Sequence, residues 1–227
     1  MLNQVIDIFT APAVAFENLR ERAPFLPPML LIVLSATALN AMYFSLVDPE
    51  FLVEDILRRV GDDLSREEEQ RIRDFGQGDR SNGRWFALLG PFATTSLILL
   101  LQAAYFSIVS LASGHGITYR RWLGMVSWAS LPAILPVLGG AVALYLSPGY
   151  ELGFRELNPL SLASLLNLET GRGASRLLDR LDIAQFWTTA LLAIGYRCWT
   201  DSTWHRSLTV AAAPIASYYG VSLAFLL

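Results

Sequence analysis

The stretch WLGMVSWASLPAILPVLGGAVALYL, residues 122–146, holds 25 residues without a single charge. At about 1.5 Å of rise per residue, a helix of this length reaches roughly 37 Å, enough to cross a hydrocarbon core of about 30 Å with some tilt. A helix buried in a soluble protein seldom keeps such a length without a polar face. Arg120 and Arg121 precede the stretch and Ser147-Pro148-Gly149 follows it. We therefore expect a membrane-spanning segment that is bounded at both ends.

The composition of the whole chain supports the same class. Of its 227 residues, 53% are hydrophobic and only 16% are charged, whereas a soluble domain carries about 25% charged residues. The mean hydropathy is +0.41. The net charge of −3 argues against nucleic-acid binding, since no excess of basic residues is available to offset phosphates. The single cysteine, Cys198, excludes an internal disulfide.

Five long apolar stretches predict five transmembrane helices in an all-α integral membrane protein that forms a single membrane domain over residues 1–227. The fourth is the weakest, because only 14 uncharged residues separate Asp182 from Arg197. It reaches across a bilayer only if residues 177–181 extend it. The predicted spans cover about 24–47, 86–112, 122–146, 178–198 and 207–227, with a hydrophilic loop at 48–84.

Two shorter helices are expected next to the spans. Apolar residues at near-helical spacing over 2–19 predict an amphipathic N-terminal helix that is interrupted at Pro12. Two interpretations of it stay open, since it can lie along the membrane interface or pack against the bundle. Asn158 and Pro159 are typical of an N-cap and a first helical position, and they predict a helix over 158–168. That helix is too short to cross, so it is interfacial or re-entrant.

The loop 48–84 contains 11 of the 20 acidic residues and seven of the 17 arginines. Because acids and arginines alternate there, we expect a solvated and mutually neutralised surface rather than a metal site. Ser65 and Glu68 have the spacing of a capping box, which predicts a helix that begins there and ends near Gly76.

The distribution of arginine gives a weak orientation. With the N-terminus inside, the inner segments hold six arginines in short connections, and the outer loops hold eleven, mostly near acids. The positive-inside rule counts short connections most strongly. We therefore expect a cytoplasmic N-terminus and a C-terminus on the opposite side.

The third predicted span contains a candidate kink. Pro132 and Pro136 each remove a helical hydrogen bond, and Gly139 and Gly140 then allow a close approach of a neighbouring helix. Three polar residues inside or beside other spans, Asn40, Gln102 and Gln185, are candidates for a polar groove. The alternative role for these amides is hydrogen bonding between helices, at about 0.6 kcal/mol each.

No arrangement of residues points to catalysis. The five uncharged cores contain no ionisable residue, and a proton relay or an intramembrane active site requires one. His115, His205, Cys198 and Asp201 fall in two loops expected on one side, but no two of them have ligand spacing on one element. We therefore expect no catalytic residue, no metal and no cofactor.

A resemblance to a known family rests on four motifs in the chain. They are IFTAPAVAFENLRER (8–22), SWASLPAILP (127–136), NPLSLASLL (158–166) and LDIAQFWTTALLAIGY (181–196). In this order they resemble the Yip domain family of Ypt/Rab-interacting membrane proteins, and its bacterial branch in particular. The likeness runs from about residue 5 to the end, and its family-like positions are Asn158, Pro159, Leu181, Asp182, Trp187 and Gly195.

The resemblance implies a five-span helical protein in a bacterial cytoplasmic membrane, with a cytoplasmic N-terminus and no known catalytic residues. Eukaryotic relatives bind Rab GTPases, partly through a longer N-terminal region with an Asp-Leu-Tyr-Gly-Pro-like motif. Such a motif does not occur among the roughly 24 residues before the first span, so we do not expect Rab binding to carry over.

The predicted function is that of a non-enzymatic integral membrane protein. It would bind membrane lipids and either a protein partner or a second copy of itself, and it would organise or shape the surrounding membrane. The alternative is a transporter or channel for a neutral or lipidic solute, which is suggested by broken helices near the midplane. The hydropathy pattern shows no inverted repeat in support of that alternative.

Overall fold

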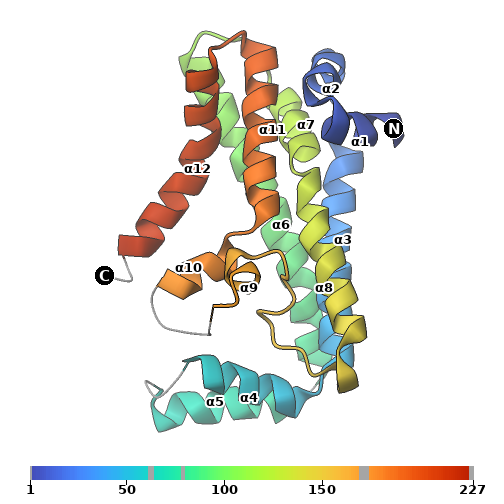
Figure 1. Cartoon of the computed structure of the whole chain (residues 1–227), viewed down its shortest axis with the longest axis vertical. Coiled ribbons are helices and arrows are strands. Elements are labelled where there is room, and N and C mark those ends of the chain that lie inside the picture. Colours follow the sequence, from blue (N-terminus) through green and yellow to red (C-terminus); the bar gives the residue numbers. More distant parts are fainter. Residues whose placement is uncertain (1, 61–63, 78–79, 169–173, 225–227) are drawn as a thin grey trace. The chain divides into compact units, whose positions relative to one another are not determined.

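A computed structural model describes residues 2–60, 64–77, 80–168 and 174–224 of the chain (Figure 1). The described residues form helices and no strand, so the predicted all-α class is confirmed. They group into two compact units. Unit 1 comprises Met1–Leu34, Ala93–Ile134 and Ile183–Leu227, and unit 2 comprises Ser35–Phe92 and Leu135–Asp182.

The helices of unit 1 lie at the two ends and in the middle of the chain. Two long helices, α3 and α6, contribute residues to both units. Unit 1 contains α1 (Leu2–Thr10), α2 (Pro12–Leu19), α7 (Tyr119–Ala129), the 3₁₀ turn η2 (Leu131–Ala133), α11 (Ile183–Thr200) and α12 (Trp204–Ala224), with parts of α3 (Leu26–Leu46) and α6 (Arg80–Ala112).

Unit 2 combines the remaining parts of α3 and α6 with shorter elements. These are α4 (Pro49–Val60), α5 (Arg66–Gln77), nearly all of α8 (Ile134–Leu146), the 3₁₀ turn η3 (Pro148–Tyr150), α9 (Leu162–Leu165) and α10 (Ala174–Arg180).

Among the described residues, three helices are long and apolar enough to cross a membrane: α3, the part of α6 from Ala87 to Ala112, and α12. A fourth candidate is α7 together with Leu131–Leu146, a pair that is bent by 43°. Only 22% of the most apolar part of α3 and of α6 is buried in the protein, and 11% of that of α12. Their outward apolar surface suits a lipid environment. A fifth crossing, by α11, stays a prediction.

The helix expected over 178–198 is divided in the structure. Helix α10 ends at Arg180 and α11 begins at Ile183. Between them the Leu181 carbonyl accepts a hydrogen bond from the backbone N–H of Leu162 (2.8 Å), and Asp182 forms an isolated antiparallel bridge. The expected extension of the fourth span by residues 177–181 is therefore corrected, because tertiary pairing takes this backbone out of the helix.

The N-terminal helices α1 and α2 pack against other helices of unit 1, and the break between them falls at the expected place. Pro12 occupies the first turn of α2, where its missing N–H costs no helical hydrogen bond. Ile8 and Phe16 are fully buried, and α2 packs against α11. The indole Nε1–H of Trp199 donates to the Phe16 carbonyl (2.8 Å) and fixes α2 to α11. One face of the N-terminal helices therefore packs against the bundle. That their opposite face lies along the membrane interface stays a prediction.

The capping box of the hydrophilic loop forms as predicted. The backbone N–H of Ser65 donates to the Glu68 carboxylate (2.9 Å), and the Glu68 N–H donates back to the Ser65 hydroxyl (3.3 Å). These hydrogen bonds favour the ionised carboxylate, so they lower the pKa of Glu68, with the backbone bond as the main cause. Helix α5 starts here and packs against α4.

Candidate functional site

The candidate site lies in unit 2, where the glycine pair of α8 meets the loop before α9. A Cβ placed on Gly139 would lie 2.9 Å from the Cγ of Pro159. A Cβ on Gly140 would lie 3.2 Å from the carbonyl carbon of Leu157 and 3.1 Å from the Cδ2 of Leu39. Because glycine has no Cβ, the loop backbone can rest directly on the helix. The close neighbour at this point is a loop, in addition to the helix α3 that carries Leu39.

The same loop is tied to the residues between α10 and α11. The Nδ2 amide of Asn158 donates to the Oδ2 of Asp182 (3.3 Å). Ser161 and Asp182 form the isolated antiparallel bridge, and Leu162 donates to the Leu181 carbonyl. Four of the family-like residues therefore meet one another and the glycine pair in one cluster, which we call the loop–glycine site: Gly139, Gly140, Asn158, Pro159, Leu181 and Asp182.

The loop–glycine site contains a polar residue that is largely shielded from water. Asp182 is only 9% exposed, and a carboxylate that leaves water needs charge or hydrogen-bond partners. In the same unit, the Arg155 guanidinium pairs with Asp179 and donates to the Leu168 carbonyl (2.7 Å). The Arg155 and Asp179 side chains are 13% and 25% exposed, so this ion pair is largely shielded from solvent. Arg155 thereby contacts both Leu168, just after α9, and Asp179 in α10.

The position of the contact along the helices is informative. Gly140 lies six residues before the end of α8 at Leu146, roughly 9 Å along the helix axis. Leu39 lies seven residues before the end of α3 at Leu46, roughly 10 Å along its axis. If both helices cross the membrane, the loop reaches below the headgroups. Irregular backbone is tolerated at such depth only where protein or water satisfies its polar groups.

The predicted kink coincides with a local change of helix type. Helix α7 ends at Ala129, and Pro132 sits in the 3₁₀ turn η2 before α8 starts at Ile134. Pro136 falls in the first turn of α8, where a missing N–H leaves no helical bond unmade. One hydroxyl reinforces the end of α7, since Ser127 donates to the Leu123 carbonyl (2.7 Å).

The three amides of the candidate polar groove have different surroundings. Asn40 donates to the Ala36 carbonyl of its own helix (3.0 Å). Gln185 accepts a hydrogen bond from the Tyr219 hydroxyl (3.1 Å) and so links α11 to α12. Gln102 lies half-buried in α6. A groove that uses all three stays a prediction, whereas Gln185 has a helix-bridging contact.

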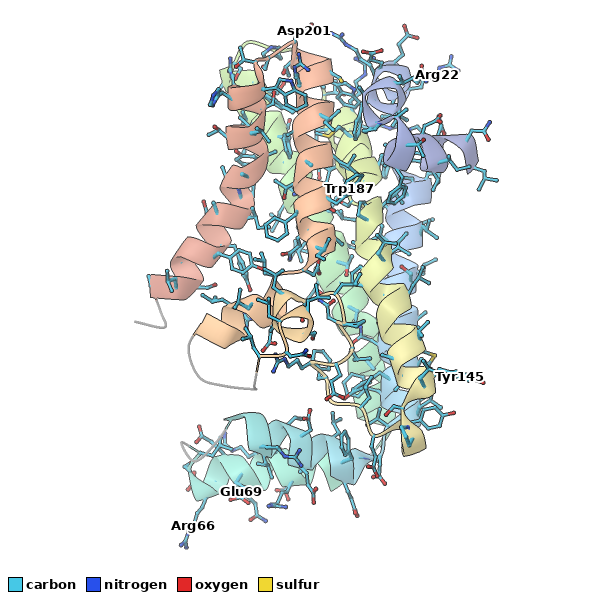
Figure 2. All side chains as sticks on the ribbon, in the orientation of Figure 1. Arg22, Arg66, Glu69, Tyr145, Trp187 and Asp201 are labelled. Atoms are coloured by element: carbon cyan, nitrogen blue, oxygen red, sulfur yellow. The ribbon has the colours of Figure 1, made fainter. Side chains whose placement is uncertain are left out.

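The remaining predicted residues lie in unit 1. Trp187 is 45% exposed on α11 (Figure 2). Gly195 is buried, and a Cβ there would lie 2.8 Å from the sulfur of Met125. The Nε2 of His115 faces the Thr200 carbonyl (3.2 Å). No group of three or more histidine, cysteine, aspartate or glutamate residues able to hold a metal occurs within the described ranges.

One local expectation in the loop–glycine site was wrong. The helix predicted to start at Asn158 starts at Leu162, and Ser161 is its N-cap, with its hydroxyl accepting from the Ser164 N–H (3.2 Å). Asn158 instead uses its side chain to reach Asp182, 24 residues away. The serine that follows Pro159-Leu160 has an equally good N-cap side chain, so Ser161 was a detectable alternative in the sequence.

The comparisons with known proteins identify one domain over nearly the whole chain. The family model of the Yip1 domain matches residues 6–225. No curated protein and no solved structure matches the chain. The match covers both units and all residues of the loop–glycine site.

Proposed function

The chain belongs to the Yip1 domain family and is an integral membrane protein, and from this premise we propose that it works without catalysis, by binding lipids or partner proteins and organising or shaping the membrane around it. The observation that carries this proposal is the seating of the loop at residues 157–161 on Gly139 and Gly140. It supplies a half-length element beside helices that are long enough to span.

A half-length element changes the membrane next to it. Where the surface of a membrane protein consists of full-length spans, the lipid chains of both leaflets pack against continuous apolar helices. Where a loop of irregular backbone enters only one leaflet, chains in that leaflet are displaced and the bilayer thins locally. Two apolar side chains at the end of α9 are suited to contact those lipid chains, since Leu165 is 47% exposed and Leu166 is 62% exposed.

The chemistry of the loop–glycine site supports a non-enzymatic role. The hydrogen bond from the Nδ2 of Asn158 to the Asp182 carboxylate joins the loop to the residue before α11, and an amide neither accepts a proton at neutral pH nor attacks a substrate. The pair is suited to hold two segments together, and we assign it the role of a latch between the loop and the residue before α11.

We also propose a cytoplasmic N-terminus, with α11 as the fifth span and the C-terminus on the opposite side. The support is the set of arginines in the short connections of unit 1. Reporter fusions test this directly. A C-terminal alkaline phosphatase, which folds only outside the cytoplasm, should be active, and a fusion in the 201–203 turn should be inactive. The reverse pattern would overturn the orientation.

Reconstitution tests the membrane-organising function. The purified chain, inserted into zwitterionic liposomes at rising protein-to-lipid ratio, should change vesicle diameter or outline in electron cryomicroscopy. Gly140→Ala, which displaces the loop, should weaken the effect, whereas Gly220→Ala on α12 should not. Unchanged vesicles, together with no lipid or protein retained through purification from native membranes, would refute the proposal.

A second candidate function is transport of a neutral or lipidic solute. The favouring observation is the helix break between α7 and α8, because interrupted helices are common at transport sites. Flux of a broad solute panel into the same liposomes separates the two. Uptake above that of empty liposomes would favour transport, and vesicle remodelling without uptake would favour the first function.

A further inference from the structure

Six arginines of unit 1 gather where its helices begin and end. Arg20 and Arg22 follow α2, Arg120 and Arg121 occupy the first turn of α7, Arg197 the last turn of α11, and Arg206 the first turn of α12. All six are exposed. Figure 1 shows these helix ends on one side of unit 1, and Figure 2 shows Arg22 and Asp201 there. We call this group the arginine surface.

Contacts between the elements confirm that the arginine surface is continuous. Arg121 donates to the Glu21 carbonyl (3.3 Å), which joins the start of α7 to the segment after α2. Arg20 pairs with Asp201 (3.6 Å) and joins that segment to the turn between α11 and α12. Arg206 donates to the Ser113 hydroxyl and joins α12 to the end of α6.

Most of the contacts of these arginines leave the positive charge uncompensated. The guanidinium of Arg197 lies 4.5 Å from the ring centre of Trp204, and that of Arg120 lies 5.8 Å from the ring centre of Phe25. Rings, carbonyls and hydroxyls orient a guanidinium without neutralising it. In the described part of unit 1, Arg20 with Asp201 is the single ion pair.

The balance of charges differs between the two units. Unit 1 has six arginines and four acids, a net charge of +2, and unit 2 has eleven arginines and 16 acids, a net charge of −5. In unit 2, Arg73 pairs with Glu69 and Arg155 pairs with Asp179. The arginine surface is therefore a local excess of positive charge in an acidic protein, and it favours an anionic ligand.

The apolar residues beside the arginine surface indicate which anion fits. Ile108 and Leu111 near the end of α6 are 67% and 78% exposed, and Leu208, one turn after Trp204, is 49% exposed. A ligand bound at the arginine surface would contact guanidinium groups with one end and these apolar side chains with the other. Phosphate with attached acyl chains matches both, because guanidinium binds phosphate in a two-pronged geometry and acyl chains cover leucine and isoleucine.

We propose that the arginine surface binds the headgroups of anionic phospholipids in the adjacent leaflet. This inference rests on the proposed function and specifies its lipid class and its site. Inorganic phosphate shares the headgroup chemistry but lacks the chains, so it should bind far more weakly. The lipid should also bind less tightly as salt is raised, since exposed charges are screened.

The test uses the purified full chain in neutral detergent, with phosphatidylglycerol and phosphatidylcholine as probes in native mass spectrometry. The chain should retain phosphatidylglycerol preferentially. Arg120→Gln with Arg121→Gln should weaken it about fivefold for each arginine removed, roughly 25-fold for the pair. Lysine at the same two positions should restore most of the affinity. Arg66→Gln with Arg71→Gln, on exposed positions of α5, is the matched control and should change nothing.

Three results would overturn the arginine surface as a lipid site. They are equal retention of the two lipids, an equal loss in the α5 control, and competition by inorganic phosphate at the concentration at which the lipid binds. The lysine variants distinguish lost lipid binding from misfolding. Lysine restores the charge but not the guanidinium contacts, so it should restore lipid binding and should not repair a fold that depends on those contacts. Vesicle remodelling in purely zwitterionic liposomes is measured alongside. If remodelling persists without a preference for anionic lipid, the site fails and the proposed function stands.

Discussion

Substituting Gly140 by alanine tests whether the loop is seated on α8. The new Cβ would lie 3.2 Å from the carbonyl carbon of Leu157 and closer than 3.0 Å to its oxygen. The opposing atoms are backbone, so no side-chain rotation relieves the contact. The loop has little freedom to retreat, because the bridge between Ser161 and Asp182 holds it on the far side.

Two opposing terms set the size of the effect. Inserting a methyl group into a well-packed contact costs about 1–3 kcal/mol. Alanine in a helix interior gains about 1 kcal/mol over glycine. Gly140→Ala should therefore lower the free energy of unfolding by up to about 2 kcal/mol. Gly220 offers a matched control on α12, since its Cβ would meet no atom within 4 Å, and alanine there should raise stability by up to about 1 kcal/mol.

The comparison of the two variants isolates the packing cost. Because the propensity gain is common to both, their difference in unfolding free energy should be about 1–3 kcal/mol. Reversible unfolding in mixed micelles, followed by tryptophan fluorescence, measures it. Amide exchange at Leu162, whose N–H bonds to Leu181, should accelerate in Gly140→Ala alone. Equal stability of the two variants and unchanged exchange at Leu162 would refute the seated loop.

Three further predictions follow from the contacts of single residues. Asp182→Leu leaves the half-buried amide of Asn158 without this acceptor and should cost about 1–3 kcal/mol in the same unfolding assay, whereas Asp182→Asn keeps a polar partner and should cost less. Trp199→Phe loses the hydrogen bond to α2 and should cost about 1–3 kcal/mol, measured with amide exchange over 2–19, whereas Trp187→Phe on the surface should stay within about 0.5 kcal/mol. The lowered pKa of Glu68 stabilises α5 fully above its ordinary value of 4.5, and the stability is lost as pH falls through the lower pKa of the folded state. The protection of the α5 amides, after correction for the intrinsic pH dependence of exchange, should follow that course, and Glu68→Gln should remove the part of the loss that Glu68 causes.

Local patterns in the sequence predicted those parts of the fold that depend on local interactions. The capping box needs only Ser65 and Glu68, three residues apart, and it forms as expected. Spans such as α3 need only a continuous apolar run. The break at Pro12 depends on one residue whose ring and missing N–H act within a single turn.

Local patterns were insufficient where a contact with a residue distant in the sequence determines the local structure. Asn158 followed by proline has the residue types of a helix start, yet its side chain pairs with Asp182. The hydrogen bond to the more distant residue removes Asn158 from the cap, and Ser161 takes its place. Gly140 indicated a close approach but not the nature of the neighbour, because a missing Cβ admits a loop carbonyl as readily as a second helix. That these residues lie together in one site could be seen only from the three-dimensional structure.

The burial of Asp182 bears most directly on whether the protein performs chemistry. The uncharged cores of the predicted spans contain no ionisable residue, and Asp182 stands just before the uncharged core of the fourth. The structure packs it at 9% exposure in the loop–glycine site, and a buried ionisable residue of a membrane protein is by default a functional candidate. Proton-coupled chemistry needs a group that exchanges the proton, whereas the hydrogen bond from Asn158 and the bridge to Ser161 hold the segment of Asp182 in place. A latch tolerates asparagine in place of the acid, so retained vesicle remodelling in Asp182→Asn would assign the carboxylate to architecture. Complete loss in a variant that still folds would assign it a role that depends on its charge or its proton.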